Sequence, residues 1–143
     1  MPTTIYRSRF PDVIVPNVSL TEFVLGRAGA HGARPAFIEA PSGRTISYAD
    51  FLEQVRRLAA GLSRRGVSKG DVVAIWSPNM PEFAVVFHAV IRLGAILSTV
   101  NTSYTPEEAA FQLRDAKPKM LVSCGFGPDR RRASRRAGQD LGP

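Results

Sequence analysis

Apolar and polar residues alternate in blocks along the chain, and the clearest block covers residues 71–108. It opens with the β-branched, apolar run Val72–Trp76, which predicts a strand, and residues 77–79 form a turn. A helix follows to about Arg92, and the apolar run 96–100 comes directly after it. Strand, helix and strand at this spacing predict a βαβ unit with parallel strands and a right-handed crossover.

The start and the faces of this helix can be predicted too. Asn79 is a good N-cap, Pro81 suits the first turn, and the Glu82 carboxylate, three residues after the cap, could reach back to it. Apolar residues cover nearly all of its circumference: Phe83, Ala84, Val85, Val86, Phe87, Ala89, Val90 and Ile91. A helix of this kind belongs inside a larger body.

The N-terminal third predicts an arm, a helix and a hairpin. Residues 1–20 lack periodicity and suggest an irregular arm laid on the surface, with isolated anchors such as Tyr6, Phe10 and Ile14. A helix is expected over 21–30, with Thr21 as its cap. Apolar runs at 36–40 and 45–48, separated by a Pro-Ser-Gly-Arg turn, predict a β-hairpin.

A strongly amphipathic helix should follow the hairpin. Ser47 and Asp50 have the spacing of a capping box, and Gly66 is placed for a left-handed residue after the last turn. Beyond the central block, Thr105 caps a helix that Pro118 terminates, and residues 120–124 form a last strand. The order βαβαβ predicts an α/β fold with a Rossmann-like layer.

Texture divides the chain into three parts: the arm and short helix (1–35), an α/β subdomain (36–124) and a basic tail (125–143) that is either a marginal helix or disordered. Of the net charge of +7, the last 18 residues contribute five Arg against two Asp. No run of 18 apolar residues and no secretory leader is present, so a soluble, cytoplasmic protein without a membrane span is expected.

Residues that could carry chemistry are few, and each has a simpler interpretation. Gly125-Phe126-Gly127 follows a strand but lacks the third glycine of a dinucleotide loop, and no GxxxxGK[ST] motif occurs. His88 has no second ligand at metal spacing, so a core histidine satisfied by one hydrogen bond is the better interpretation. His31 is expected in a loop. Cys124 closes a strand without a basic neighbour and is expected to be an inert thiol.

The acidic and basic candidates for a functional site also have structural interpretations. Asp71 and Glu82 are best explained as turn and cap residues, and the arginines at 130–136 as a solvated tail without interleaved aromatics. The loop 101–104 is polar and follows a strand, the usual place of a ligand site in α/β proteins. It has no phosphate-binding glycines and no acid–base pair, so it is interpreted as scaffold. No catalytic, cofactor-binding or metal-binding residue is assigned.

Three ordered blocks resemble the N-terminal portion of the adenylate-forming acid–CoA ligases, also called AMP-dependent synthetases, and most closely the 4-coumarate–CoA ligase branch. The first is YRSRFPD at 6–12, and the second is TISYAD at 45–50. The third combines SPN at 77–79 and LGA at 93–95 with YTPEE at 104–108. The resemblance covers residues 5 to about 124.

The resemblance implies a parent reaction in which a carboxylate, such as 4-coumarate, attacks ATP with Mg²⁺ to form an acyl-adenylate, and CoA then displaces AMP. The family's phosphate loop, adenine contacts and C-terminal lid lie downstream of the matched part. By itself this chain is therefore not expected to catalyse the reaction, and it needs no cofactor of its own.

Two alternatives stay open at this point. One is a small basic protein that binds nucleic acid through its arginine tail, which the lack of interleaved aromatic residues makes the weaker hypothesis. The other is a non-catalytic partner that docks onto a ligase chain, suggested by the all-round apolar helix at 80–93.

Overall fold

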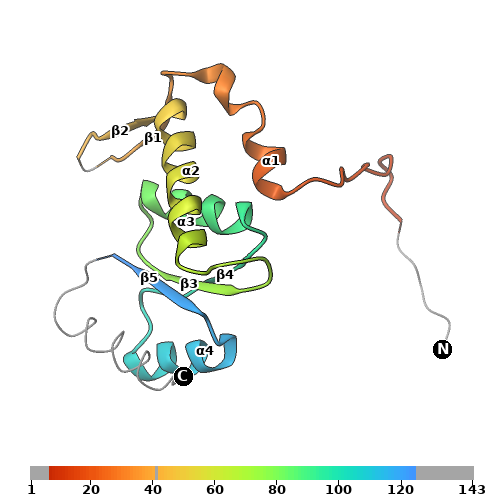
Figure 1. Ribbon diagram of the computed structural model, residues 1–143. Helices are drawn as coiled ribbons and strands as arrows, with labels where there is room; N and C mark the ends of the chain where they lie inside the picture. Colours follow the sequence, from red (N-terminus) through yellow and green to blue (C-terminus); the bar gives the residue numbers. More distant parts are fainter. Residues whose placement is uncertain (1–6, 41, 125–143) are drawn as a thin grey trace.

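The computed structural model describes residues 7–40 and 42–124, and a three-stranded parallel sheet lies at its centre (Figure 1). The strands are β3 (Val72–Trp76), β4 (Ile96–Thr99) and β5 (Met120–Ser123), in the order β4-β3-β5. β3 pairs with both neighbours, Val72 opposite Ile96 on one side and Val73 opposite Met120 on the other. The predicted parallel pairing and the βαβαβ order are confirmed.

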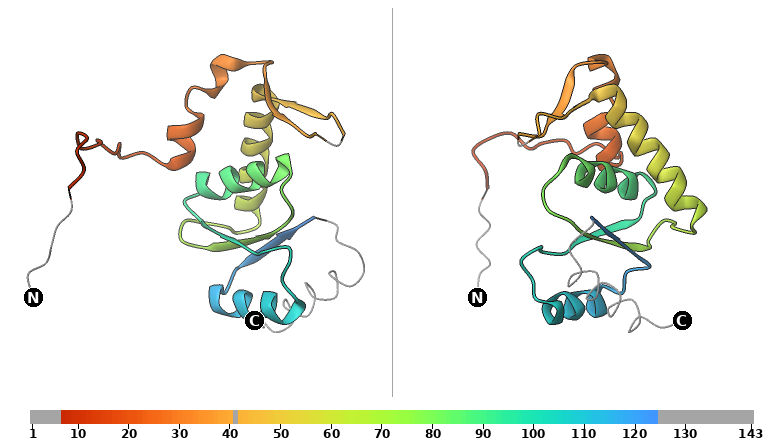
Figure 2. Two further views of the ribbon diagram at one scale, coloured as in Figure 1. Left: turned by 180° about the vertical axis from the view of Figure 1, so that it is seen from behind. Right: turned by 90° about the vertical axis from the view of Figure 1, so that its left-hand side faces the viewer.

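Two helices cover opposite faces of the sheet, α3 (Pro81–Arg92) on one and α4 (Pro106–Ala116) on the other (Figures 1 and 2). Successive side chains of β3 point to opposite faces. Val73 and Ile75 accordingly pack in one core cluster with α3, whereas Ala74 and Trp76 pack in another with α4. The central strand is buried on both sides, which is why its sequence is continuously apolar.

Helix α2 (Tyr48–Arg64) adds a further layer outside α3. One face of α2 is buried, through Phe51, Val55, Ala59 and Leu62. No residue of α3 before Arg92 is exposed, because the sheet, α2 and α1 surround it. The prediction that this helix lies inside a larger body is confirmed.

The hairpin consists of β1 (Pro35–Ile38) and β2 (Thr45–Ser47), paired antiparallel. It packs on α2 through a third cluster that joins Ile46 to Phe51 and Val55. The Ser47 hydroxyl accepts a hydrogen bond from the Asp50 backbone N–H at 3.1 Å and caps α2 as predicted. The Asp50 carboxylate accepts from the same hydroxyl, so the capping box is closed by the side chain rather than by the backbone.

Of the other predictions about helix ends, those for α2 and α4 are confirmed and the one for α3 is wrong. Gly66 has a φ of 86° after α2, as expected of a left-handed residue. Thr105 and Glu108 form the complete capping box of α4. The prediction for α3 is wrong, because its N-cap is Met80 and no side chain caps it. Pro81 is thus the first helical residue, and Glu82 sits one position too early to close a box.

The predicted helix at 21–30 is also wrong in its bounds. Helix α1 (Leu20–Leu25) is followed by η1, a 3₁₀ turn at Ala28–His31. Ser19 is the cap of α1 and accepts from the Glu22 backbone N–H at 3.1 Å. Thr21, the predicted cap, is instead buried inside the first turn. Before α1, the described arm extends away from the body in every view (Figures 1 and 2). The prediction that it lies on the surface is wrong, because its expected anchors Phe10 and Ile14 are exposed.

The described residues contain no helix with the length and apolar character that crossing a bilayer requires. The basic tail, with its predicted choice between helix and disorder, lies outside the described residues.

Candidate functional site at the carboxyl edge of the sheet

A cavity of about 600 Å³ opens where β3 and β4 end, at the edge where open α/β sheets bind ligands. The turn after β3 and the loop after β4 form its two sides, and α3 and α4 each contribute one side chain. Its lining residues are Ser77, Pro78, Asn79, Phe83, Thr99, Val100, Asn101, Thr102, Tyr104 and Gln112. The structure thus brings together the 77–79 turn and the 101–104 loop that the sequence placed after successive strands.

Hydrogen bonds hold this loop in one conformation. The Asn101 side-chain oxygen accepts from the Ser103 backbone N–H at 2.9 Å, and the Asn101 carbonyl accepts from the Tyr104 N–H at 3.2 Å. From α4, the Gln112 side-chain amide donates to the Thr99 carbonyl at 2.9 Å. The cavity wall is therefore fixed to both the sheet and the helix.

The chemistry of this cavity is neutral. The Asn79 amide and the hydroxyls of Thr102 and Tyr104 make no hydrogen bond within the described part of the chain, so they are available to a ligand. No Asp, Glu, His, Lys or Arg is among the lining residues. The cavity can accept and donate hydrogen bonds, but it holds no acid–base pair and no cation for a phosphate.

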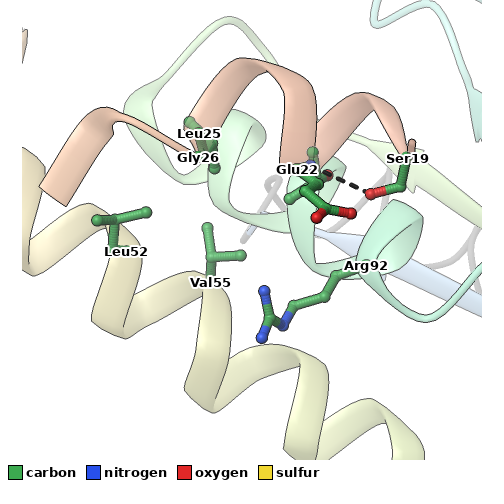
Figure 3. A pocket seen from close by; sticks show the side chains of 8 residues that line it. Ser19, Glu22, Leu25, Gly26, Leu52, Val55 and Arg92 are labelled. Carbon is green, nitrogen blue, oxygen red and sulfur yellow. Dashed lines mark hydrogen bonds between the residues drawn. The ribbon is translucent and has the colours of Figure 1, made fainter. Parts of the chain in front are cut away.

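A second cavity, of about 470 Å³, lies between α1, α2 and the end of α3 (Figure 3). Leu25 of α1 and, on the other side, Leu52 and Val55 of α2 give it apolar walls (Figure 3). The Arg92 side chain extends across it below Glu22, and these two form no ion pair (Figure 3). The opposed charges leave no net preference for an anion or a cation.

His88 lies beside this second cavity, at the junction of three helices. Its Nδ1 atom is 3.0 Å from the Thr21 hydroxyl of α1, and its ring meets Phe51 of α2 edge-on at 5.8 Å. Burial lowers the His88 pKa. The predicted hydrogen-bond partner is confirmed, but His88 is half-buried and does not belong to the core.

Glu82 is the second residue of α3, and its carboxylate is held by Arg44 of the hairpin. The guanidinium donates two hydrogen bonds to it, at 2.5 and 3.0 Å. These bonds lower the pKa of Glu82, and the two parallel bonds of an Arg–carboxylate pair fix its geometry. The contact ties the hairpin to α3, and sequence reasoning missed it because residues 44 and 82 are far apart.

Asp71 is a turn residue, as predicted, and lies at the opposite, amino edge of the sheet. Its Oδ2 atom accepts from the Ser68 backbone N–H at 2.7 Å and from Lys119 Nζ at 2.8 Å. Lys119, followed by these Ser68 bonds, lowers the Asp71 pKa to about 2. Lys119 precedes β5 as Asp71 precedes β3, so parallel pairing brings the two side chains together.

Comparison with known proteins decides the family. The sequence profile described as AMP-binding enzyme matches residues 26–140, which is most of the chain. The chain belongs to the AMP-binding enzyme family. The chain resembles the 4-coumarate–CoA ligase 4 of Arabidopsis thaliana, with 40% identity over 124 residues, and the 4-coumarate–CoA ligase 3 of Oryza sativa subsp. japonica, with 41% over 120. Both matches cover 83% of this chain and 22% of the relative.

Solved structures of this family have the same fold. A putative long-chain-fatty-acid CoA ligase from Rhodopseudomonas palustris superposes with a TM-score of 0.76 at 36% identity, covering 87% of this chain and 30% of that one. The N-terminal domain of FACL13 from Mycobacterium tuberculosis gives 0.72 at 26% identity, covering 86% and 29%. The predicted N-terminal α/β layer of an adenylate-forming enzyme is confirmed, and the chain spans about a fifth of the length of the curated relatives.

The AMP-binding family implies ATP, Mg²⁺ and CoA for its full-length members. The carboxyl-edge cavity has no cation, the second cavity has only Arg92 beside Glu22, and neither has a glycine-rich loop with which to hold a triphosphate. The described residues also contain no group of three or more His, Cys, Asp or Glu that could hold a metal ion. The residues present therefore do not fit the nucleotide or its metal.

The remaining candidates lie apart from the carboxyl-edge cavity or beyond the described residues. His31 is exposed and ends the 3₁₀ turn η1 instead of lying in a loop, with its ring 4.9 Å from Tyr48. Cys124 is half-buried directly after β5. Gly125-Phe126-Gly127 and the arginines at 130–136 fall outside the described residues.

Proposed function

We propose that this chain is the N-terminal α/β layer of an acyl- or aryl-CoA ligase, without catalytic activity of its own. The observation that carries the proposal is that the AMP-binding profile matches most of the chain while the chain spans 22% of its curated relatives. The parent reaction is ATP-dependent activation of a carboxylate such as 4-coumarate, followed by thioester formation with CoA. The identities with 4-coumarate–CoA ligases support this parent reaction.

The sheet supports docking onto further parts of a ligase. Among the described residues, β4 and β5 each pair only with β3 and leave their outer edges without a strand. Parallel sheets occur almost only where they are covered, and unpaired edges attract another strand. On β4, Ile96 is exposed as well. We therefore place the docking partner, a ligase chain, against this subdomain.

The nucleic-acid alternative is not favoured. Family membership explains the chain from residue 26 onwards, and the arginines on which that alternative depends lie outside the described residues. We keep the cytoplasm as the proposed compartment. A relative that is 38% identical is the peroxisomal OPC-8:0-CoA ligase 1 of Arabidopsis thaliana, so fractionation of cells that produce the protein tests this part of the proposal.

A chimera tests the proposed function. The chain replaces the matched segment of Arabidopsis 4-coumarate–CoA ligase 4, and the chimera and the isolated chain are each incubated with ATP, Mg²⁺, CoA and 4-coumarate. Thioester is expected from the chimera and neither thioester nor AMP from the isolated chain. Thioester from the isolated chain contradicts its inactivity, and a folded chimera that forms no acyl-adenylate contradicts its role in a ligase.

A further inference from the structure

Exposed apolar side chains are concentrated in one segment of this molecule. Eight of the twelve exposed large hydrophobic residues of the described chain lie between positions 10 and 24: Phe10, Val13, Ile14, Val15, Val18, Leu20, Phe23 and Val24. Scattered single residues of this kind are normal on a surface, but a contiguous group marks an interaction site. The greatest exposure is at Ile14, at 92%.

The backbone in this segment lacks partners as well. Residues 12–15 make no hydrogen bond to any other described residue, and Pro11 and Pro16 prevent a helix from forming across them. Three β-branched side chains in a row favour a strand. A short apolar segment with free N–H and C=O groups has what an added strand needs, since main-chain bonds supply affinity and side chains supply specificity.

The body holds the base of this segment in place. Directly after it, Ser19 caps α1, and Thr21 fastens α1 to His88 of α3. Figures 1 and 2 show the arm leaving the body from this fixed point and not folding back over the sheet. Nothing within the described residues covers the apolar side chains of the arm.

We propose that residues 10–18, here called the arm, dock in extended form on the part of an acyl- or aryl-CoA ligase that this chain does not contain. This inference rests on the proposed function. The proposed partner of the arm is the remaining part of such a ligase, because about four-fifths of the length of the relatives has no counterpart here. Charge argues against a lipid surface, because the described arm and its approach carry only Arg7 and Arg9 against Asp12.

The test compares one substitution in two settings. Ile14→Asp is made in the isolated chain and in the chimera with 4-coumarate–CoA ligase 4, and urea unfolding is followed for both. In the isolated chain the substitution should change little, because Ile14 is already exposed. In the chimera it should raise the unfolding equilibrium constant at least about tenfold, because a covered isoleucine is replaced by a buried charge. Asn17→Asp adds the same charge within the arm without removing an apolar group, and should leave both proteins unchanged.

The outcomes separate this inference from the proposed function. A chimera that forms thioester and tolerates Ile14→Asp as well as Asn17→Asp overturns the docked arm and leaves the proposed function standing. A folded but inactive chimera counts against the proposed function first. Self-association of the isolated chain that Ile14→Asp abolishes assigns the arm to a second copy of this chain, which also overturns the inference.

Discussion

Replacing Thr21 by valine should release α1 from the body while leaving the sheet and its helices folded. Valine keeps the shape of threonine and removes only the hydroxyl. That hydroxyl is 3.0 Å from His88 Nδ1 and donates to the His88 carbonyl at 3.3 Å, in a side chain only 3% exposed. When its single proton goes to the carbonyl, Nδ1 must carry a proton and donate to the hydroxyl oxygen. One oxygen thus serves two polar groups of α3.

The size of the effect follows from the burial of this pair. Removing one partner of a buried hydrogen bond costs about 1–3 kcal/mol, because the remaining group is left without a partner. Helix α1 has only six residues and is too short to persist without tertiary contacts. The cost should therefore appear as local opening of α1, with hydrogen exchange of the Phe23 and Gly26 amides accelerated about 5- to 150-fold.

Thr21→Ser is the matched control, because serine keeps the hydroxyl and loses one methyl group, worth about 0.8 kcal/mol. Hydrogen exchange followed by NMR should show the valine variant more open in α1 than the serine variant. Equal exchange in the two variants would refute the assignment of the hydroxyl as the fastening of α1. The same result would follow if α1 were held by its apolar contacts alone, through Leu25.

The His88 side of the contact adds a pH dependence. Burial lowers the His88 pKa below the value of about 6.5 expected in the unfolded chain, so the unfolded state binds the proton first. The contribution of His88 to stability is therefore complete above about pH 6.5 and is lost as the pH falls through the folded-state pKa. His88→Gln should flatten the pH dependence of the unfolding free energy in this range.

Two further predictions concern the faces and the amino edge of the sheet. Leu113 of α4 is 1% exposed, so Leu113→Ala should lower the unfolding free energy by about 2–5 kcal/mol in urea titrations. Phe111 on the same helix is 71% exposed, so Phe111→Ala should change that free energy by less than about 0.5 kcal/mol. Lys119→Met should raise the Asp71 pKa from about 2 toward its ordinary value, as measured by NMR titration of the carboxyl carbon, and a Lys119→Arg variant should keep it low. The Asp71 pKa is lower in the folded state than in the unfolded state. The stabilisation from its bonds to Lys119 and Ser68 is therefore present above about pH 4 and is lost between about pH 4 and 2.

Local patterns predicted most of the elements, since each depends on neighbours in sequence. The apolar run of β3, the amphipathic helix α2 and the Thr105 cap of α4 all appear where the sequence placed them. The errors concern where a helix begins. Helix α3 has its N-cap one residue after Asn79, and the Glu82 carboxylate bonds Arg44 instead of closing a box. Helix α1 has its N-cap two residues before Thr21, whose hydroxyl contacts His88.

The candidate site could be predicted only in outline. Asn79 and the loop 101–104 follow successive strands, so their meeting at one edge follows from the parallel sheet alone. The participation of Phe83 and Gln112 required the packing of α3 and α4, which their sequence does not specify. The absence of charge from the lining could be anticipated, because neither segment contains an ionisable residue other than Tyr104.

In this chain, charged side chains hold the layers together, while the surfaces without a partner are neutral or apolar. A ligase that binds ATP needs cations and a phosphate loop. The charged side chains described here stabilise the fold instead: Arg44 connects the hairpin to α3, and Lys119 connects β5 to the turn before β3. The charged side chains that bridge distant segments are thus used for holding layers together. What is left unsatisfied is apolar or neutral, in the arm, the sheet edges and the Asn79–Tyr104 cavity. Surfaces of that kind are completed by further protein. The proposed function therefore predicts that the substrate chemistry lies where this layer meets the rest of a ligase.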